Sequence, residues 1–232
     1  MALSTPAKIT HIIFDVDGLL IDTESIYTKV ISDLCAQYGK KFTWEMKAQQ
    51  MGQTELKAAN VIINALQLPL TPEEYLSRCN DKFEHLFPTT PLMPGAEKLV
   101  RHLHKHEVPM ALASGSNSHN FELKTRNHKE LFSLFSHAVL SSSDSEVKHG
   151  KPAPDCFLIC AARFANPPKP ENALVFEDAP NGVEASYAAG MPVVWVPDAQ
   201  ADHSLLKDKA CLILDSLEQF KPEDFGLPPY NS

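Results

Sequence analysis

Residues 12–20 read Ile-Ile-Phe-Asp-Val-Asp-Gly-Leu-Leu, an apolar run that ends abruptly in two carboxylates followed by a glycine. A short apolar run bounded by turn residues is typical of a buried strand in a parallel sheet. Ligands of open α/β sheets bind at the carboxyl ends of the strands, so Asp15 and Asp17 are expected where chemistry takes place. Two carboxylates this close repel each other and need a cation or a shared proton, which indicates a divalent metal such as Mg²⁺. Taken alone, the motif fits a simple polar turn equally well, and the rest of the chain has to decide.

The composition limits the classes of partner. The 232 residues fit one large domain or one domain with an insertion, and 44% hydrophobic residues are ordinary for a soluble globular protein. A net charge of −8 with scattered Lys and Arg argues against nucleic acid but not against a phosphate ester, because a metal and a few local cations can dominate one site. Five cysteines without CxxC spacing predict reduced thiols, and no apolar run reaches the ~18 residues of a membrane span. We therefore expect a cytoplasmic monomer without a signal peptide and without membrane or nucleic-acid partners.

Strand and helix patterns alternate along most of the chain, and one helical block interrupts them. Strands are expected at residues 9–14, 109–113, 137–140, 173–176, 192–196 and 211–214, with helices at 94–106, from 118 to about 135, at 155–164 and at 181–190. Asp155 is expected to be the N-cap of the helix at 155–164. Four helices and no convincing strand are expected between residues 22 and 91, at 23–38, 43–51, 54–66 and 72–86. The alternation predicts an α/β fold with a doubly wound, mostly parallel, Rossmann-like sheet. Residues 1–20 and 93–232 would form this core, and residues 21–92 would form an inserted helical cap with hinges near 20–22 and 90–94.

Polar side chains follow three further strand or loop ends of the predicted core. They are Ser114 with Gly115, Ser116 and Asn117, then Lys151 with Pro152, and finally Glu177 with Asp178. A carboxylate can attack phosphorus, a second can protonate the leaving oxygen and later activate water, and Mg²⁺ can offset the repulsion between anions. A lysine, hydroxyls and backbone N–H groups can hold the phosphoryl oxygens. Together with Asp15 and Asp17, these groups contain what phosphoryl transfer requires.

In order, spacing and strand context, these residues resemble the four motifs of the haloacid dehalogenase-like hydrolase superfamily, whose small helical cap the inserted block also resembles. The resemblance implies that Asp15 is the nucleophile and a metal ligand. It implies that Asp17 is the general acid and base, with its backbone carbonyl facing the metal. Ser114 would bind the phosphoryl group, assisted by its loop, and Lys151 would neutralise the nucleophile and the phosphoryl oxygens.

The fourth motif would complete a magnesium site. By the same resemblance Asp178 is a carboxylate ligand of Mg²⁺, and Glu177 contributes directly or through water. Superfamily members that cleave carbon–halogen bonds lack an acid at the position of Asp17, so the chain resembles a phosphatase or a phosphomutase acting through an aspartyl phosphate. Its partner would be a small phosphate ester.

Further segments are similar to the animal pseudouridine-5′-phosphatases of this superfamily; they are residues 51–52, 62–69, 91–99, 132–137, 149–155 and 174–184. That similarity implies pseudouridine 5′-monophosphate as the substrate, whereas the residues themselves indicate phosphate chemistry only. Other small sugar or nucleotide phosphates stay open. Related sugar phosphomutases have a histidine near the position of Tyr27 and an arginine in the loop corresponding to residues 52–55, which here reads Gly-Gln-Thr-Glu, so a β-phosphoglucomutase-like activity is the less favoured alternative. Ser116 and Asn117 are either phosphate-loop donors or helix caps.

Overall fold

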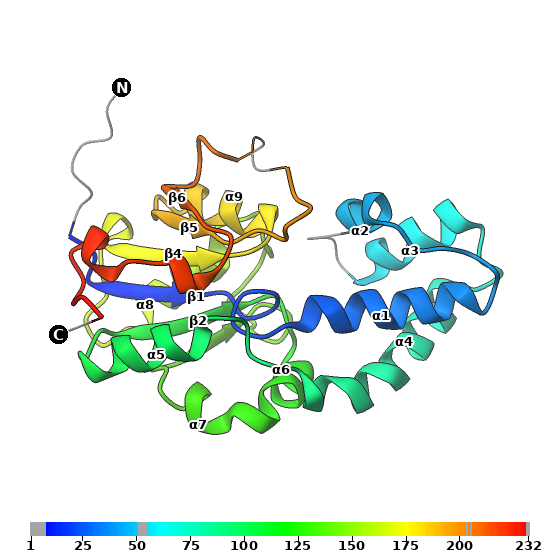
Figure 1. Cartoon of the computed structure of the whole chain (residues 1–232), viewed down its shortest axis with the longest axis horizontal. Helices are drawn as coiled ribbons and strands as arrows, with labels where there is room; N and C mark the ends of the chain where they lie inside the picture. The colour runs from blue at the N-terminus through cyan, green and yellow to red at the C-terminus, as the bar shows by residue number, and fades with distance from the viewer. Residues whose placement is uncertain (1–7, 51–54, 203, 205, 231–232) are drawn as a thin grey trace.

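A single six-stranded parallel sheet forms the centre of the core in the computed structural model, which describes residues 8–50, 55–202, 204 and 206–230 (Figure 1). The strands are β1 (His11–Phe14), β2 (Met110–Ser114), β3 (Ala138–Leu140), β4 (Ala173–Glu177), β5 (Val193–Trp195) and β6 (Leu212–Ile213). Their spatial order is β3-β2-β1-β4-β5-β6, and every neighbouring pair is parallel. The predicted α/β, doubly wound fold is thereby confirmed, with β1 at the centre where the strand order reverses.

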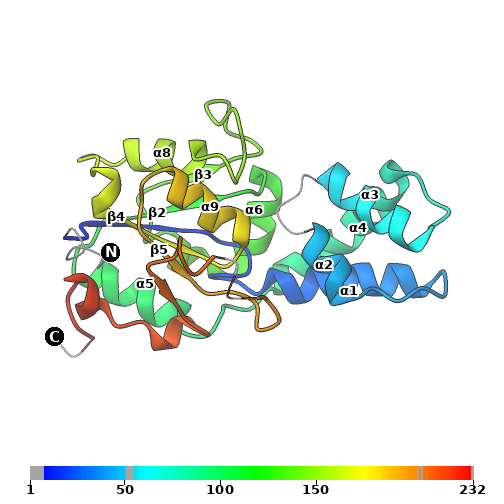
Figure 2. The ribbon, with the colours of Figure 1, turned by 90° about the horizontal axis from the view of Figure 1, so that it is seen from above.

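The sheet is covered on both faces, which explains why its strands read as continuous apolar runs. Side chains of β1 alternate between the faces, because the strand period is two. Ile12 and Phe14 pack in the same cluster as Leu99 of α5 (Ala96–Lys105), whereas Ile13 belongs to a second cluster with Phe157 of α8 (Asp155–Ala162) and residues of α9 (Pro180–Ala188). Figure 2 shows α8 and α9 on one side of the strands and α5 on the other.

Four helices lie beyond the carboxyl ends of the strands and enclose an apolar cluster of their own (Figures 1 and 2). They are α1 (Thr23–Ala36), α2 (Trp44–Gln50), α3 (Glu55–Leu66) and α4 (Pro72–Leu86). We call this helical part the cap. Thr71 and Glu74 form a capping box at the start of α4, with the Thr71 hydroxyl accepting from the Glu74 N–H and the Glu74 carboxylate accepting from the Thr71 N–H. The proline of this helix stands at its first position, where no N–H is needed.

Two chain segments join the cap to the core, and they run side by side. The N–H of Asp22 donates to the carbonyl of Pro91 over 2.9 Å, and the N–H of Met93 donates to the carbonyl of Leu20 over 2.9 Å. These are the segments expected to act as hinges. Two backbone hydrogen bonds therefore join the entry to the cap with the exit from it.

The structure differs from the expected elements in two places: one expected helix is interrupted, and another has a different N-cap. The helix expected from residue 118 to about 135 consists of α6 (Ser118–Thr125), a 3₁₀ turn at Arg126–His128 and α7 (Lys129–Phe132). The turn lets His128 hydrogen-bond to the carbonyl of Thr90, close to the cap exit. Asp155 was expected to cap α8, and this was wrong: α8 begins at Asp155, whose carboxylate accepts instead from the N–H groups of Lys148 and His149.

Candidate active site

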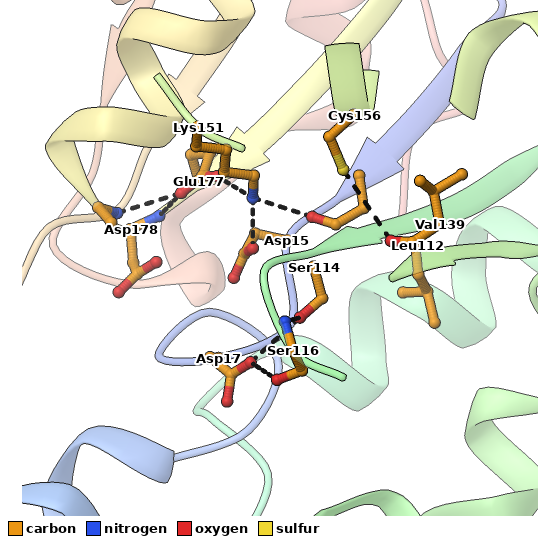
Figure 3. A network of polar contacts seen from close by, with 12 residues as sticks. Asp15, Asp17, Leu112, Ser114, Ser116, Val139, Lys151, Cys156, Glu177 and Asp178 are labelled. Atoms are coloured by element: carbon orange, nitrogen blue, oxygen red, sulfur yellow. Dashed lines mark hydrogen bonds and ion pairs between the residues drawn. The ribbon is translucent and has the colours of Figure 1, made fainter. Parts of the chain in front are cut away.

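Adjacent strands bring the first and fourth motifs together. Phe14 pairs with Phe176 in the ladder between β1 and β4, so Asp15 and Glu177 follow at neighbouring positions of the sheet edge. The ammonium of Lys151 lies between them, 2.6 Å from Oδ1 of Asp15 and 2.6 Å from Oε1 of Glu177 (Figure 3). Its third hydrogen bond goes to the carbonyl of Ala113 at the end of β2, over 2.9 Å. One lysine therefore ties three strands together at their carboxyl ends.

A group of three buried carboxylates forms beside this lysine. Oxygens of Asp15, Glu177 and Asp178 all lie within 4.8 Å of one another, and in the described part of the chain no other three side chains of His, Cys, Asp or Glu come together in this way. Burial and the neighbouring carboxylates raise the pKa of Asp15 to about 7 against the pull of Lys151, and the same causes raise the pKa of Asp178. Burial opposes the charge of Lys151, but Asp15 and Glu177 hold its pKa well above the usual range for lysine.

These residues fit a magnesium ion. Carboxylate oxygens are the ligands that this hard cation prefers. The three carboxylates also carry more negative charge than the single ammonium of Lys151 can neutralise. A divalent cation between them would favour the ionised form of Asp15 and Asp178, which burial alone disfavours. The chemistry of the donor set thus supports the expected cofactor.

Two glycines make room for the carboxylates. Gly18 has a φ of +78°, in the left-handed region that favours glycine, and a Cβ there would overlap Oδ2 of Asp178. A Cβ on Gly182, in the first turn of α9, would overlap the carboxylate of Glu177. That carboxylate also accepts from the N–H groups of Asp178 and Ala179. The glycines of the first and fourth motifs are therefore explained by close approach to acidic side chains.

The carboxylate of Asp17 belongs to a second group. Its Oδ1 lies 2.6 Å from the ammonium of Lys124, and its Oδ2 accepts from the hydroxyls of Ser116 over 2.9 Å and of Ser114 over 3.2 Å. Figure 3 shows Asp17 with these serines, apart from Asp15, Glu177 and Asp178. Burial opposes ionisation of Asp17, but Lys124 and the hydroxyls lower its pKa below the usual aspartate range. The expected contribution of Asp17 to the metal site through its backbone carbonyl stays a prediction.

The loop after β2 has divided roles. Asn117 is the N-cap of α6, because its side chain accepts from the N–H of Asn120 over 2.8 Å, so the cap alternative holds for this residue. The side chain of Ser116 faces Asp17 instead. Gly115 has open space around its Cα, and its carbonyl accepts from the hydroxyl of Ser142 over 2.7 Å. Phosphate binding by Ser114, Gly115 and Ser116 stays a prediction.

Lys124 was missed in the sequence, because a single lysine inside a helix carries no motif. The residue is 1% exposed and lies ten positions after Ser114 on α6. Besides Asp17 it contacts the hydroxyl of Tyr27, which is at the cap side of the junction. The ring of Tyr27 packs edge-on against Phe83 and Phe87, and burial raises its hydroxyl pKa to about 12. Of the loop compared with the phosphomutases, residues 52–54 lie outside the described residues.

A cleft of about 370 Å³ separates the cap from the core next to the loop after β2. Its walls include Asn80, Phe83 and Glu84 of α4, and Asn117, His119 and Asn120 at the start of α6. His119 hydrogen-bonds to Glu84 across it. Through Asn117 the cleft reaches the loop after β2.

Comparison with known proteins assigns the family. Residues 9–190 match the haloacid dehalogenase-like hydrolase family. The chain belongs to this family. It is also 48% identical over 230 residues to a Drosophila melanogaster protein named as a probable pseudouridine-5′-phosphatase, covering 99% of both chains. The identity is 47% over 226 residues to (DL)-glycerol-3-phosphatase 2 of Arabidopsis thaliana, covering 96% of this chain and 93% of the relative.

Solved structures share the fold. A family hydrolase from Deinococcus radiodurans, solved with bound phosphate and sodium, superposes with a TM-score of 0.79 at 24% identity, covering 97% of this chain and all of that one. A β-phosphoglucomutase from Clostridium difficile superposes with a TM-score of 0.73 at 24% identity, covering 94% and 97%. At these identities the likeness concerns the fold. In the described residues, no helix is both long enough and apolar enough to span a membrane.

Proposed function

We propose that this hydrolase is a magnesium-dependent phosphomonoesterase that works through an aspartyl phosphate on Asp15, with pseudouridine 5′-monophosphate as its substrate. One observation carries the proposal: Asp15 is buried at the end of the central strand, paired with Lys151 and grouped with two further carboxylates. The high identity to a probable pseudouridine-5′-phosphatase supports the substrate. Phosphatases recur among the relatives, so a phosphoric monoester hydrolase is the common element.

The first step would be attack of Asp15 on phosphorus. A bond forms between its carboxylate oxygen and phosphorus, the ester P–O bond breaks, and the leaving oxygen takes a proton from Asp17. Lys151 neutralises charge on Asp15 and on the phosphoryl oxygens, and Ser114 donates to the latter. An anionic phosphoryl group beside Asp17 raises the proton affinity of that carboxylate, which favours the protonated form required here.

The second step would be hydrolysis of the acyl phosphate. Asp17, ionised after the first step, removes a proton from water as the water attacks phosphorus, and Asp15 leaves as a carboxylate. Asp15, Asp178 and Glu177, with the backbone carbonyl of Asp17, would hold the magnesium ion, which when bound offsets repulsion between the anionic nucleophile and the phosphoryl oxygens. The cap would exclude bulk water by closing on its paired hinge segments.

A panel of phosphate esters tests the substrate. We would measure phosphate release from pseudouridine 5′-monophosphate, uridine 5′-monophosphate, glycerol 3-phosphate and β-glucose 1-phosphate, with Mg²⁺ and then with chelator. The proposal expects rapid, magnesium-dependent release from the first ester and little from the second. Glycerol 3-phosphate is the second candidate, because the glycerol-3-phosphatase relative is nearly as similar. Isomerisation of the sugar phosphate without phosphate release would show a mutase.

Two variants test the mechanism and the metal site separately. Asp15→Asn should abolish turnover while the protein keeps its fold, and retained turnover would reject the nucleophile. Without any substrate, Mg²⁺ should raise the melting temperature of the native protein, since a ligand that binds only the folded state stabilises it. Asp178→Asn should remove most of that increase. An equal increase in this variant would place the ion elsewhere.

A further inference from the structure

Lys124 contacts the expected general acid without itself being part of any motif that the sequence suggested. An ammonium group has three N–H bonds, and each has an acceptor here. They are Oδ1 of Asp17 at 2.6 Å, the hydroxyl of Ser116 at 2.9 Å and the hydroxyl of Tyr27 at 3.0 Å. The ring of Phe87 lies 4.7 Å away and offers its face to the cation. A lysine that is 1% exposed is thus fully satisfied and charged.

The three acceptors come from three different parts of the chain. Asp17 follows β1, Ser116 lies in the loop after β2, and Tyr27 belongs to α1 in the cap. Phe87 directly follows the last residue of α4, where the chain leaves the cap. Lys124 itself lies on α6, so a single side chain connects the nucleophile loop, the phosphate loop and both ends of the cap.

The position of Asp17 depends on this contact. The Asp17 side chain is 21% exposed at the rim of the site, and its two oxygens are held by groups of different kinds. Hydroxyls of Ser114 and Ser116 hold Oδ2, and Lys124 is the only ion-pair partner of Oδ1 among the described residues. Charge-assisted hydrogen bonds are about twice as strong as neutral ones, so Lys124 dominates the orientation of the carboxylate.

We propose that Lys124 is a positioning residue, which fixes the carboxylate of Asp17 for proton transfer to the leaving group and links that orientation to the cap through Tyr27. This inference rests on the role proposed above for Asp17. In this role Lys124 touches neither the phosphoryl group nor the leaving group. When the cap moves, Tyr27 moves with α1, and the ammonium loses one of its three acceptors.

The test compares two esters of nearly the same shape, phenyl phosphate and 4-nitrophenyl phosphate, by their kcat/KM values. Phenolate is the stronger base and needs a proton on leaving, whereas 4-nitrophenolate leaves readily without one. Lys124→Met keeps the length of the side chain and removes the charge. We expect it to lower kcat/KM for phenyl phosphate about 10- to 100-fold more than for 4-nitrophenyl phosphate, since general acid catalysis contributes about 10²- to 10⁴-fold in all. Tyr27→Phe should also lower kcat/KM more for phenyl phosphate than for 4-nitrophenyl phosphate, but by a smaller factor.

Lys47→Met is the matched control. Lys47 is also buried, and it also joins the cap to the core, but its ion pairs are with Glu24 over 3.1 Å and with Asp198 over 3.3 Å rather than with Asp17. Any loss of kcat/KM in Lys47→Met should be equal for the two esters. Equal losses, or a gain, for both esters in Lys124→Met would overturn the inference and leave Lys124 a structural residue of the cap junction. Failure of the native protein to hydrolyse either ester would instead reject the proposed function.

Discussion

Replacing Gly182 by alanine should destabilise the protein, although glycine-to-alanine changes inside helices normally stabilise. The added Cβ would overlap the carboxylate of Glu177, which is 1% exposed and cannot turn toward solvent without leaving its partners. Those partners are the ammonium of Lys151 at 2.6 Å and the N–H groups of Asp178 at 3.1 Å and Ala179 at 3.2 Å. A displaced carboxylate weakens all three hydrogen bonds together.

The magnitude follows from opposing contributions. Overpacking of a buried site costs about 1–3 kcal/mol, and a weakened hydrogen bond to a buried charge costs about 1.5–3 kcal/mol. Alanine recovers about 1 kcal/mol of helix propensity relative to glycine. We therefore expect Gly182→Ala to lower the free energy of unfolding by about 1.5 to 5 kcal/mol.

Urea denaturation, followed by circular dichroism, measures this difference. Gly150→Ala is the matched control, because a Cβ there meets no heavy atom within 4 Å, and its change should stay within about 1 kcal/mol. In the Glu177→Ala background the collision is absent, so adding Gly182→Ala should be neutral or stabilising. A Gly182→Ala protein as stable as the native one, or the same loss in both backgrounds, would refute the reasoning.

Three further predictions concern stability away from the site. Thr71→Ala removes the hydroxyl of the capping box with Glu74 and should lower the free energy of unfolding by about 1 kcal/mol, measured in urea, whereas Thr71→Ser should recover most of it. Leu99→Ala in the fully buried face of α5 should cost about 2–5 kcal/mol, and a loss below 1 kcal/mol would show that the core closes over the cavity. Hydrogen bonds from Arg163 hold the pKa of Asp144 below its usual 3.8, so the ion pair stabilises the folded state at neutral pH and this contribution fades as the pH falls below that value. The difference in unfolding free energy between native protein and Asp144→Asn should accordingly be constant from pH 6 to 8 and shrink in acid, and a difference independent of pH would contradict the assignment.

Local sequence was sufficient to predict a strand or helix wherever the residues within that element and at its ends form a recognisable pattern. The strand ending at Asp15 was readable because buried parallel strands are short, apolar and followed by polar residues, and the helix at Pro72–Leu86 because its capping residues precede a periodic pattern. Asp155 misled the same reasoning, since an acidic residue before an apolar helix can equally serve a neighbouring loop, and here it binds two N–H groups of that loop.

The sequence by itself determined the fold class, the order of the motifs and the residue types at the strand ends, because each depends on neighbours within a few positions along the chain. Only the tertiary structure decided that Lys151 also pairs with Glu177, across 26 positions, and that Lys124 reaches Asp17 across 107. The second pair leaves no local pattern, since a buried lysine and an exposed one look alike in a helix. The division of the acidic residues into the cluster of Asp15, Glu177 and Asp178 and a separate Asp17–Lys124 group therefore follows from the packing of sheet, loops and cap.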